Sequence, residues 1–282
     1  MDAIADRYAE LWRSIRNDGD MPRDPSEAML FLDRVRAALD RQSATLDARA
    51  DARIVANSFI VEAVAHEGDR TQILKLRHRD LGTHHALKTP TQTHDAVAAG
   101  LLLREARLMS AMRHPNIVSA EMVLRLSDGR PALVMEWMAG SVADILNGAL
   151  SITGERLHGY ARDMLSGLAA IHDAGMVHAD ISPRNLLLTA GDMPTLKIAD
   201  FGIALEHGET HASLGLASAG SPGFGAPAGA ADRAGDVRAC GAVFALMLDR
   251  TANPEPHLTE LCATLRNAPA GMSARAVLDA LV

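Results

Sequence analysis

Two short acidic loops near the middle of the chain restrict its fold and function more than any other feature. The first is His178-Ala179-Asp180-Ile181-Ser182-Pro183-Arg184-Asn185, and the second, which begins after fourteen further residues, is Asp200-Phe201-Gly202. The first loop offers a carboxylate that can accept a hydroxyl proton and, five residues on, an amide oxygen for Mg²⁺. The second offers a carboxylate for the metal ion that bridges nucleotide phosphates. This pairing is typical of phosphoryl transfer.

Composition argues against several other classes of protein. The 282 residues, of which 48% are hydrophobic, suffice for one bilobal domain and an extension. A formal net charge of −7 argues against nucleic-acid binding, and two cysteines are too few for a disulfide framework. No apolar stretch has spanning length, and the acidic start does not resemble a signal peptide. We therefore expect a cytoplasmic protein without a membrane span, with secretion by a route that needs no cleavable signal left open.

The first part of the chain has the periodicity of two amphipathic helices. Apolar residues recur at helical spacing from Ala3 to Ile15, and a second helix begins at Asp24-Pro25. Asp24 can cap the backbone amides there, and proline suits the first helical turn. We expect residues 1–50 to form a helical extension that packs on the following domain, with docking of a regulatory partner as the alternative.

After this extension the pattern changes to that of short β-strands. The β-like runs cover residues 54–65, 72–76 and 83–88, and turn residues lie between them. The chain has only three lysines, and Lys88 ends the third run. A functional lysine must therefore be one of three.

A helix is predicted to follow the third strand. Leu102, Ala106 and Met109 share one face of this helix, which can aim Glu105 at Lys88 on the adjacent strand. An isolated Lys–Glu pair is usually solvated and of little energetic value. Here the order and spacing of the pair relative to the two acidic loops favour a functional role.

From residue 53 to residue 282 the chain resembles a protein kinase of the eukaryotic-like serine/threonine type, which is found also in bacteria. The resemblance implies an α+β, bilobal protein-kinase-like fold with ATP bound between the lobes. The implied domain is 51–282, with a β-rich N-lobe at about 51–136 and a helical C-lobe at about 139–282. The matching elements, in family order and at family-like spacings, are Lys88, Glu105, residues 114–118, residues 133–136, Asp180, Asn185, Asp200-Phe201-Gly202, residues 220–224 and Asp236-Val237.

The resemblance also implies a role for each charged residue of the site. Lys88 would hold the ATP phosphates, and Glu105 would orient Lys88. Asp180 would be the base that aligns the acceptor hydroxyl, while Asn185 and Asp200 would ligate Mg²⁺.

The adenine site is implied in the same way. Met135 stands at the gatekeeper position, and the backbones of Glu136 and Met138 would offer hydrogen bonds to adenine. Three apolar residues are expected to sandwich the base: Ile73, Ala86 and Leu187.

The loop that would cover the phosphates departs from the family pattern. Counting back from Lys88 places this loop at His66–Thr71, where only Gly68 of the three usual glycines remains. Side chains at positions 66 and 71 keep the backbone farther from the phosphates, and Asp69 repels them. We expect either weak ATP affinity or a loop that becomes ordered only when a partner binds.

The catalytic loop has two further departures. The usual Arg before the catalytic Asp is Ala179, so we expect activity that does not depend on phosphorylation of the activation segment. The usual Lys is Ser182, and we assign the compensating cation to Arg184. The activation-segment hydroxyls in question are Thr210, Ser213 and Ser218.

The resemblance therefore favours a serine/threonine protein kinase that acts on a protein substrate, with the chain itself as a further candidate substrate. Ser221 stands where such kinases carry a Thr that faces the catalytic Asp. One alternative is a pseudokinase that binds nucleotide as a signalling scaffold. Another is a small-molecule phosphotransferase, because His178-Ala179-Asp180 followed by Asn185 also resembles the aminoglycoside-kinase loop; residues 200–202 and 220–227 argue against it.

Overall fold

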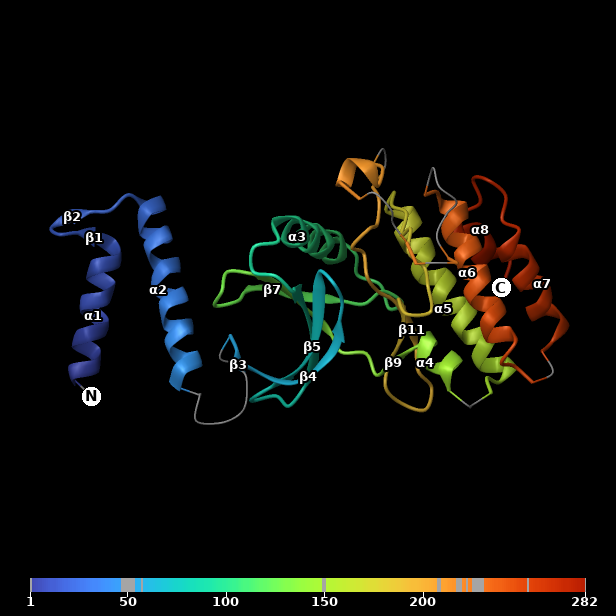
Figure 1. Cartoon of the computed structure of the whole chain (residues 1–282), viewed down its shortest axis with the longest axis horizontal. Coiled ribbons are helices and arrows are strands. Elements are labelled where there is room, and N and C mark those ends of the chain that lie inside the picture. The colour runs from blue at the N-terminus through green and yellow to red at the C-terminus, as the bar shows by residue number, and fades with distance from the viewer. Residues whose placement is uncertain are drawn as a thin grey trace.

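A computed structural model describes residues 2–46, 54–56, 58–148, 151–206, 209–216, 220–221, 223–224, 231–252 and 254–281. In Figure 1 a helical pair, a β-sheet with one helix, and a mainly helical region follow one another in chain order. Among the described residues, no helix has the length and apolar character that crossing a membrane requires.

The N-lobe is built on an antiparallel six-stranded sheet with strand order β3-β4-β5-β6-β8-β7. One face of the sheet buries Leu74, Leu76 and Leu87, because alternate residues of a strand point to the same side. The predicted strands are confirmed, although the first run begins as a two-residue strand before a turn. The strands are β3 (Ile54–Val55), β4 (Phe59–Glu67), β5 (Thr71–His78), β6 (His84–Pro90), β7 (Ala120–Arg125) and β8 (Pro131–Glu136).

Helix α3 (Ala96–Ala111) packs against β6, β7 and β8. It begins at Asp95, whose side chain accepts a hydrogen bond from the backbone amide of Ala98 (2.9 Å). The predicted apolar face of Leu102, Ala106 and Met109 is confirmed, since all three side chains are buried.

The C-lobe is organised around the long helix α5 (Gly154–Asp173), which contacts α6, α8 and β11. A side chain at Gly167 would lie 2.5 Å from the carbonyl oxygen of Asn116, so glycine permits α5 to approach the segment that joins α3 to β7. The other elements are β9 (Gly140–Ser141), α4 (Val142–Asn147), β10 (Leu186–Leu188), β11 (Leu196–Ile198), the 3-10 helix η1 (Ala212–Leu214), α6 (Arg233–Leu248), α7 (Pro256–Arg266) and α8 (Ala274–Asp279).

The N-terminal pair consists of α1 (Asp2–Arg16), β1 (Asn17–Asp18), β2 (Met21–Pro22) and α2 (Pro25–Leu46). Both predicted helices are present, and the Asp24 carboxylate accepts a hydrogen bond from the Ser26 amide (2.8 Å). The side chains of Met29 and Leu30 are 67% and 65% exposed, and the packing of this pair on the following domain stays a prediction. Helix α1 contacts α2, and Ile15 near the end of α1 is buried, so part of the apolar surface of α1 has its partner within the pair.

Candidate active site

The structure brings Lys88, Glu105 and Asp200 together. Lys88 Nζ lies 2.9 Å from both carboxylate oxygens of Glu105 and 2.8 Å from Asp200 Oδ1. The antiparallel register places Lys88 of β6 opposite Ile73 of β5 and Leu133 of β8, so its backbone is fixed on both sides. One turn of α3 before Met109, Glu105 is only 2% exposed. A carboxylate so deeply buried requires a charged partner, and Lys88 supplies it.

Burial and charge together set the ionisation of these three residues. Burial alone would lower the pKa of Lys88, but the carboxylates of Asp200 and Glu105 outweigh burial and raise it. Burial raises the pKa of Glu105 in spite of the ammonium group. Burial would also raise the pKa of Asp200, but Lys88 outweighs this effect and lowers it. A protonated lysine and an ionised Asp200 are the groups that a nucleotide phosphate and a cation need.

Asp180 and Asn185 form the second part of the site. The Asn185 amide nitrogen donates hydrogen bonds to the Asp180 carbonyl oxygen (2.9 Å) and to Asp180 Oδ2 (2.8 Å). Asp180 Oδ1 accepts a hydrogen bond from the backbone amide of Ser221 (2.7 Å). The carboxylate is therefore held in one orientation, and the oxygen of the Asn185 amide is left for another ligand.

The donor set fits a magnesium ion. The hydrogen bonds that Asp200 accepts from Lys88 and Gly202 reach Oδ1, which leaves Oδ2 for a cation within the described part of the chain. The Asp200 side chain is 44% exposed, so this oxygen is accessible. One carboxylate and one amide oxygen, completed by phosphate oxygens and water, suit Mg²⁺.

Asp236 at the start of α6 anchors the catalytic loop, a role that sequence reasoning did not assign to it. Its carboxylate accepts hydrogen bonds from the backbone amides of His178 (2.7 Å) and Ala179 (2.8 Å) and lies 3.1 Å from His172 Nε2. Ala179 has a φ of 65°, which a non-glycine residue adopts only when its surroundings impose it. The two amide bonds to Asp236 impose this conformation and thereby direct Asp180. The sequence signal that could have indicated this role is the place of Asp236 in the Asp236-Val237 element, which matches the family pattern.

The second acidic loop is also held in an uncommon conformation. Asp200 has a φ of 67°, and Phe201 beside it is fully buried. The ring of Phe201 packs edge-on against His178, with 4.9 Å between the ring centroids. His178 Nε2 lies 3.1 Å from the carbonyl oxygen of Ala199, so the two acidic loops are joined directly.

The residues expected to contact adenine, Met135, Glu136 and Met138, lie in the hinge segment, residues 135–138, at and just beyond the end of β8. Met135 pairs with Ala86 of β6, and both are buried, as is Met138. The Glu136 side chain has a role that the sequence did not indicate. Both of its carboxylate oxygens lie 2.8 Å from Lys197 Nζ on β11, and one accepts a hydrogen bond from the Ser119 amide (2.7 Å). The hinge is thus tied to the strand that leads to Asp200.

The remaining predicted residues lie in two strands, a turn and the catalytic loop. Ile73 is on β5 and Leu187 is on β10, and both are partly buried against the main core. Gly68 is in the tight turn between β4 and β5, where its amide donates a hydrogen bond to the carbonyl oxygen of Thr71 (2.9 Å). Arg184 is exposed on the catalytic loop. Ser182, by contrast, is 2% exposed, and its hydroxyl has no hydrogen-bond partner among the described residues.

Known protein kinases are similar to about half of this chain. Mitogen-activated protein kinase kinase 9 of Arabidopsis thaliana is 32% identical over 133 residues, which are 47% of this chain and 42% of that protein. Mitogen-activated protein kinase kinase 7 of the same plant is 31% identical over 142 residues, 50% of this chain and 45% of that protein. Serine/threonine-protein kinase GL21140 of Drosophila persimilis is 29% identical over 156 residues, 54% of this chain and 20% of that protein. The chain thus spans less than half the length of these relatives.

A match to a family model covers a longer stretch than any of these relatives. Residues 62–260, more than half of the chain, match the model described as the protein kinase domain. This range contains both acidic loops, the lysine and its glutamate, and the loop anchor at the start of α6. The chain belongs to the protein kinase family.

Proposed function

We propose that this chain is an ATP- and Mg²⁺-dependent kinase that transfers the γ-phosphate to serine or threonine hydroxyls of proteins. The observation that carries the proposal is the position of Lys88 Nζ, 2.9 Å from Glu105 and 2.8 Å from Asp200. In the family this arrangement holds the nucleotide phosphates and the metal ion at one place. The names of the relatives support the choice of serine and threonine.

The residues of the catalytic loop would align and deprotonate the acceptor. The acceptor hydroxyl would approach Asp180, and its proton would pass to that carboxylate as the hydroxyl oxygen bonds to the γ-phosphorus. The bond between this phosphorus and the oxygen that bridges to the β-phosphate would break in the same transfer, and ADP would leave. Asn185 would keep the carboxylate oriented through its bond to Oδ2. Mg²⁺, when bound, would neutralise charge on the phosphate oxygens, and the oxygens of Asp200 and Asn185 would hold it.

Ser182 occupies the position of the usual lysine, and Arg184 carries the cation that we expect to replace it. Ser182 is buried and brings no charge, whereas Arg184 is exposed four residues after Asp180. We assign Arg184 the role of the cation that lies near the transferred phosphate. An Arg184→Ala variant with unchanged turnover would remove this assignment.

Independence from activation-segment phosphorylation is part of the proposal. Arg104 on α3 forms an ion pair with Glu209 and donates a hydrogen bond to the carbonyl oxygen of Ala204 (2.7 Å). The Glu209 carboxylate thus forms with Arg104 the kind of ion pair that a phosphorylated residue would otherwise form with an arginine. Among the described residues, the hydroxyls of Thr210 and Ser213 accept hydrogen bonds from each other's backbone amides (3.2 and 3.1 Å, respectively) rather than from a cation. Ser218, the third hydroxyl in question, lies outside the described residues.

The exposed apolar residues of the N-terminal pair suit a regulatory partner. Met29 and Leu30 are 67% and 65% exposed in the described part of the chain. The low cysteine count favours a reducing compartment such as the cytoplasm for this protein.

A transfer assay and a binding measurement together test the proposal against both alternatives. The wild-type chain is incubated with Mg²⁺ and γ-labelled ATP and with either a mixture of basic and acidic proteins or an aminoglycoside, alongside Asp180→Asn, Asp200→Ala and the control Asp192→Asn. Nucleotide binding by each protein is measured in parallel. We expect labelled protein with the wild type and the control only. Nucleotide binding without any transfer would indicate the pseudokinase. Transfer to an aminoglycoside but not to protein would indicate the small-molecule enzyme.

A further inference from the structure

The turn between β4 and β5 is attached to the linker that leads into α3. This turn, residues 68–70, is the part of the N-lobe that would cover the nucleotide phosphates. The Thr91 backbone amide donates a hydrogen bond to the carbonyl oxygen of Arg70 (2.9 Å), and the Thr91 hydroxyl donates one to that of Gly68 (3.3 Å). The tip of the hairpin is therefore bonded to the linker, so a movement of the linker would move the tip.

The Arg70 side chain makes a second attachment. Its Nε lies 3.2 Å from Asp95 Oδ2, and its Nη2 lies 3.4 Å from Asp95 Oδ1. Asp95 is also the N-cap of α3, because Oδ1 accepts the hydrogen bond of the Ala98 amide. The Ala98 amide and then the Arg70 guanidinium hold the pKa of Asp95 below its usual value, so the carboxylate is ionised at neutral pH. One side chain thus serves both the hairpin and the helix.

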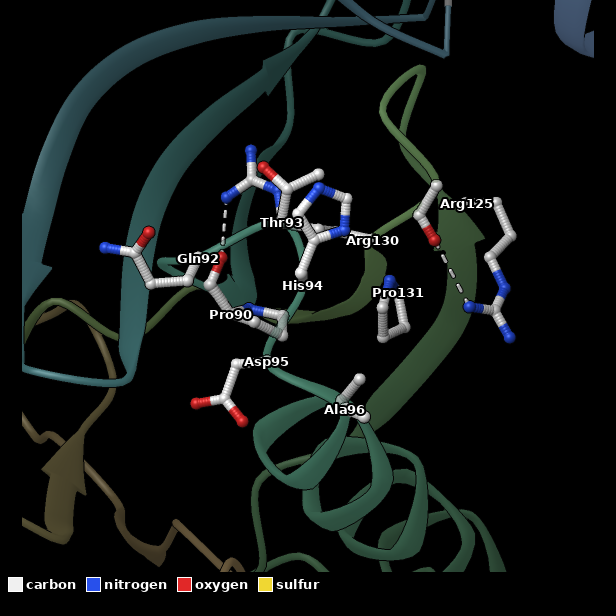
Figure 2. Close-up of a pocket in the computed structure, with 11 residues that line it drawn as sticks. Pro90, Gln92, Thr93, His94, Asp95, Ala96, Arg125, Arg130 and Pro131 are labelled. Atoms are coloured by element: carbon white, nitrogen blue, oxygen red, sulfur yellow. Dashed lines mark hydrogen bonds between the residues drawn. The ribbon is translucent and has the colours of Figure 1, made fainter.

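The linker itself is fixed from its other side. Figure 2 shows Arg130 joined to Pro90 by a dashed line, with Asp95 at the beginning of the helix. Arg130 donates hydrogen bonds to the carbonyl oxygens of Pro90 (2.6 Å) and Thr91 (3.2 Å). Its side chain is 10% exposed and is held in turn by Asp128 (2.8 Å). The hairpin is consequently attached to a point that the β7–β8 turn keeps in place.

The same helix carries the residue that orients Lys88. Glu105 lies ten residues after Asp95, and α3 is continuous between them. A displacement of the hairpin tip that breaks the bonds to Asp95 would disturb the N-cap of this helix, and a rotation of the helix would pull on the hairpin. The position of the phosphate-covering turn and the contact between Glu105 and Lys88 are therefore linked through Asp95.

We propose that Arg70 and Asp95 are positioning residues for the nucleotide, which hold the phosphate-covering turn in place before the nucleotide binds. This inference rests on the proposed function, since it assumes that the cleft binds ATP. A hairpin with one glycine is stiffer than one with three, and a turn ordered in advance avoids the ordering cost at binding. The attachment of Arg70 to Asp95 thus orders the turn without the partner that we expected the turn to need.

The expected effect is modest, because Arg70 is half exposed. The side chains of Arg70 and Asp95 are 51% and 20% exposed. Ion pairs of this kind typically change an equilibrium by a factor of up to about five, and salt weakens them. We therefore expect the loss of the pair to weaken nucleotide binding roughly threefold to fivefold at low salt and less at high salt.

The test uses a double-mutant cycle with Arg70→Gln and Asp95→Asn. Asparagine is as good an N-cap as aspartate, so the second change keeps the bond from Ala98 and removes the charge. The dissociation constant of fluorescent mant-ATP with Mg²⁺ is measured at about 0.05 and 0.5 M salt. The control is Arg77→Gln on the same hairpin, which breaks a comparable pair with Glu62 (3.0 Å).

Each single variant is expected to bind mant-ATP more weakly by the factor given above, and the double variant no more weakly than either. The KM for ATP should rise by the same factor, while kcat at saturating ATP changes less than twofold, and Arg77→Gln should match the wild type. Single variants that bind as the wild type does, or a double variant whose loss is the product of the two, would overturn the inference alone. A wild type that binds no nucleotide would overturn the proposed function and this inference with it.

Discussion

Arg104 and Glu209 form an ion pair that joins α3 to the activation segment, and Arg104 is the residue directly before Glu105. The Glu209 carboxylate also accepts a hydrogen bond from the backbone amide of Glu206 (2.8 Å). The segment that follows Asp200 is thereby folded onto the helix that orients Lys88. A charge that is part of the sequence, rather than one added by phosphorylation, makes this connection.

Replacement of Glu209 by Gln should lower the activity. Charge-assisted hydrogen bonds at partly buried sites contribute about 1 to 2 kcal/mol, so we expect kcat/KM to fall roughly fivefold to thirtyfold. The exchanged pair Arg104→Glu with Glu209→Arg should recover part of this loss. Steady-state kinetics on a protein substrate measures both effects. A Thr210→Ala, Ser213→Ala variant serves as the control and should keep its rate; its inactivation would contradict independence from phosphorylation.

Replacement of Lys88 by Met should destabilise the fold as well as abolish transfer. Glu105 is 2% exposed, and without the ammonium group its charge would be buried without a counterion. We expect the free energy of unfolding to fall by about 3 to 5 kcal/mol at neutral pH. Denaturant titration measures this loss.

A second substitution separates stability from catalysis. Lys88→Met combined with Glu105→Leu removes both charges, and such replacements are often neutral in stability. The double variant should therefore recover most of the lost stability while remaining inactive. If the double variant were as unstable as Lys88→Met alone, the account of the buried charge would be wrong.

The sequence predicted the parts of the site that depend on order and spacing. Lys88, Glu105, Asp180 and Asn185 stand in the family register, and β-strand and helix periodicity place the first two on neighbouring elements. The structure pairs Lys88 with Glu105 and Asp180 with Asn185, as the register required. Ser221 is a further example, since its amide contacts Asp180 across a gap of 41 residues.

Contacts that depend on side-chain direction could not be predicted. The pairing of Lys197 with Glu136 joins residues 61 positions apart, and nothing in either sequence segment indicates that the side chains converge. Cation–π contact of Lys75 with Trp137, at 5.4 Å from the ring centroid, is similar. Lys75 and Lys197 therefore both contact the hinge segment, although only Lys88 could be assigned a role from the sequence.

The packing of the N-terminal pair shows another limit. An amphipathic stripe indicates that a helix needs an apolar partner but not which partner it has. That the stripe packs on the following domain stays a prediction, and Met29 of α2 is 67% exposed. Periodicity carries no information on the distance between two units joined by a linker.

The pH dependence of stability should reveal the ion pair between Lys88 and Asp200. The pKa of Asp200 is lowered in the folded state, so its contribution is present above the unfolded value of about 3.9 and is lost as the pH falls through the folded value. The pKa of Lys88 is raised, so its contribution is present below about 10.4 and is lost as the pH rises through the folded value. Between about pH 5 and 9 both contributions should be constant.

Asp200→Asn tests this window. The difference in unfolding free energy between the wild type and the variant should be level from about pH 5 to 9 and should shrink below about pH 4. Urea titrations across this range measure it. A difference that instead fell steadily between pH 7 and pH 5 would show that another group controls the stability.

Asp236 should be required for turnover because it holds the catalytic loop, although it is not among the residues expected to bind nucleotide or acceptor. Its carboxylate is 3% exposed and accepts the amide hydrogen bonds of His178 and Ala179 on different oxygens. In Asp236→Asn only one oxygen remains, and the new NH₂ group would face a backbone N–H. An unsatisfied buried donor costs about 1 to 3 kcal/mol, and the strained φ of Ala179 would lose its support.

A misplaced catalytic loop should lower kcat more than it raises the KM for ATP. A shift of about 1 Å in a catalytic group can cost about a hundredfold, so we expect a loss of this size in kcat for Asp236→Asn. The KM for ATP should change less than threefold, because Lys88 and the hinge do not contact Asp236. Asp173→Asn on α5 is the matched control, since it breaks an exposed ion pair with Arg275 (2.7 Å) away from the loop. Equal kcat values for wild type and Asp236→Asn would show that the loop keeps its conformation without this anchor.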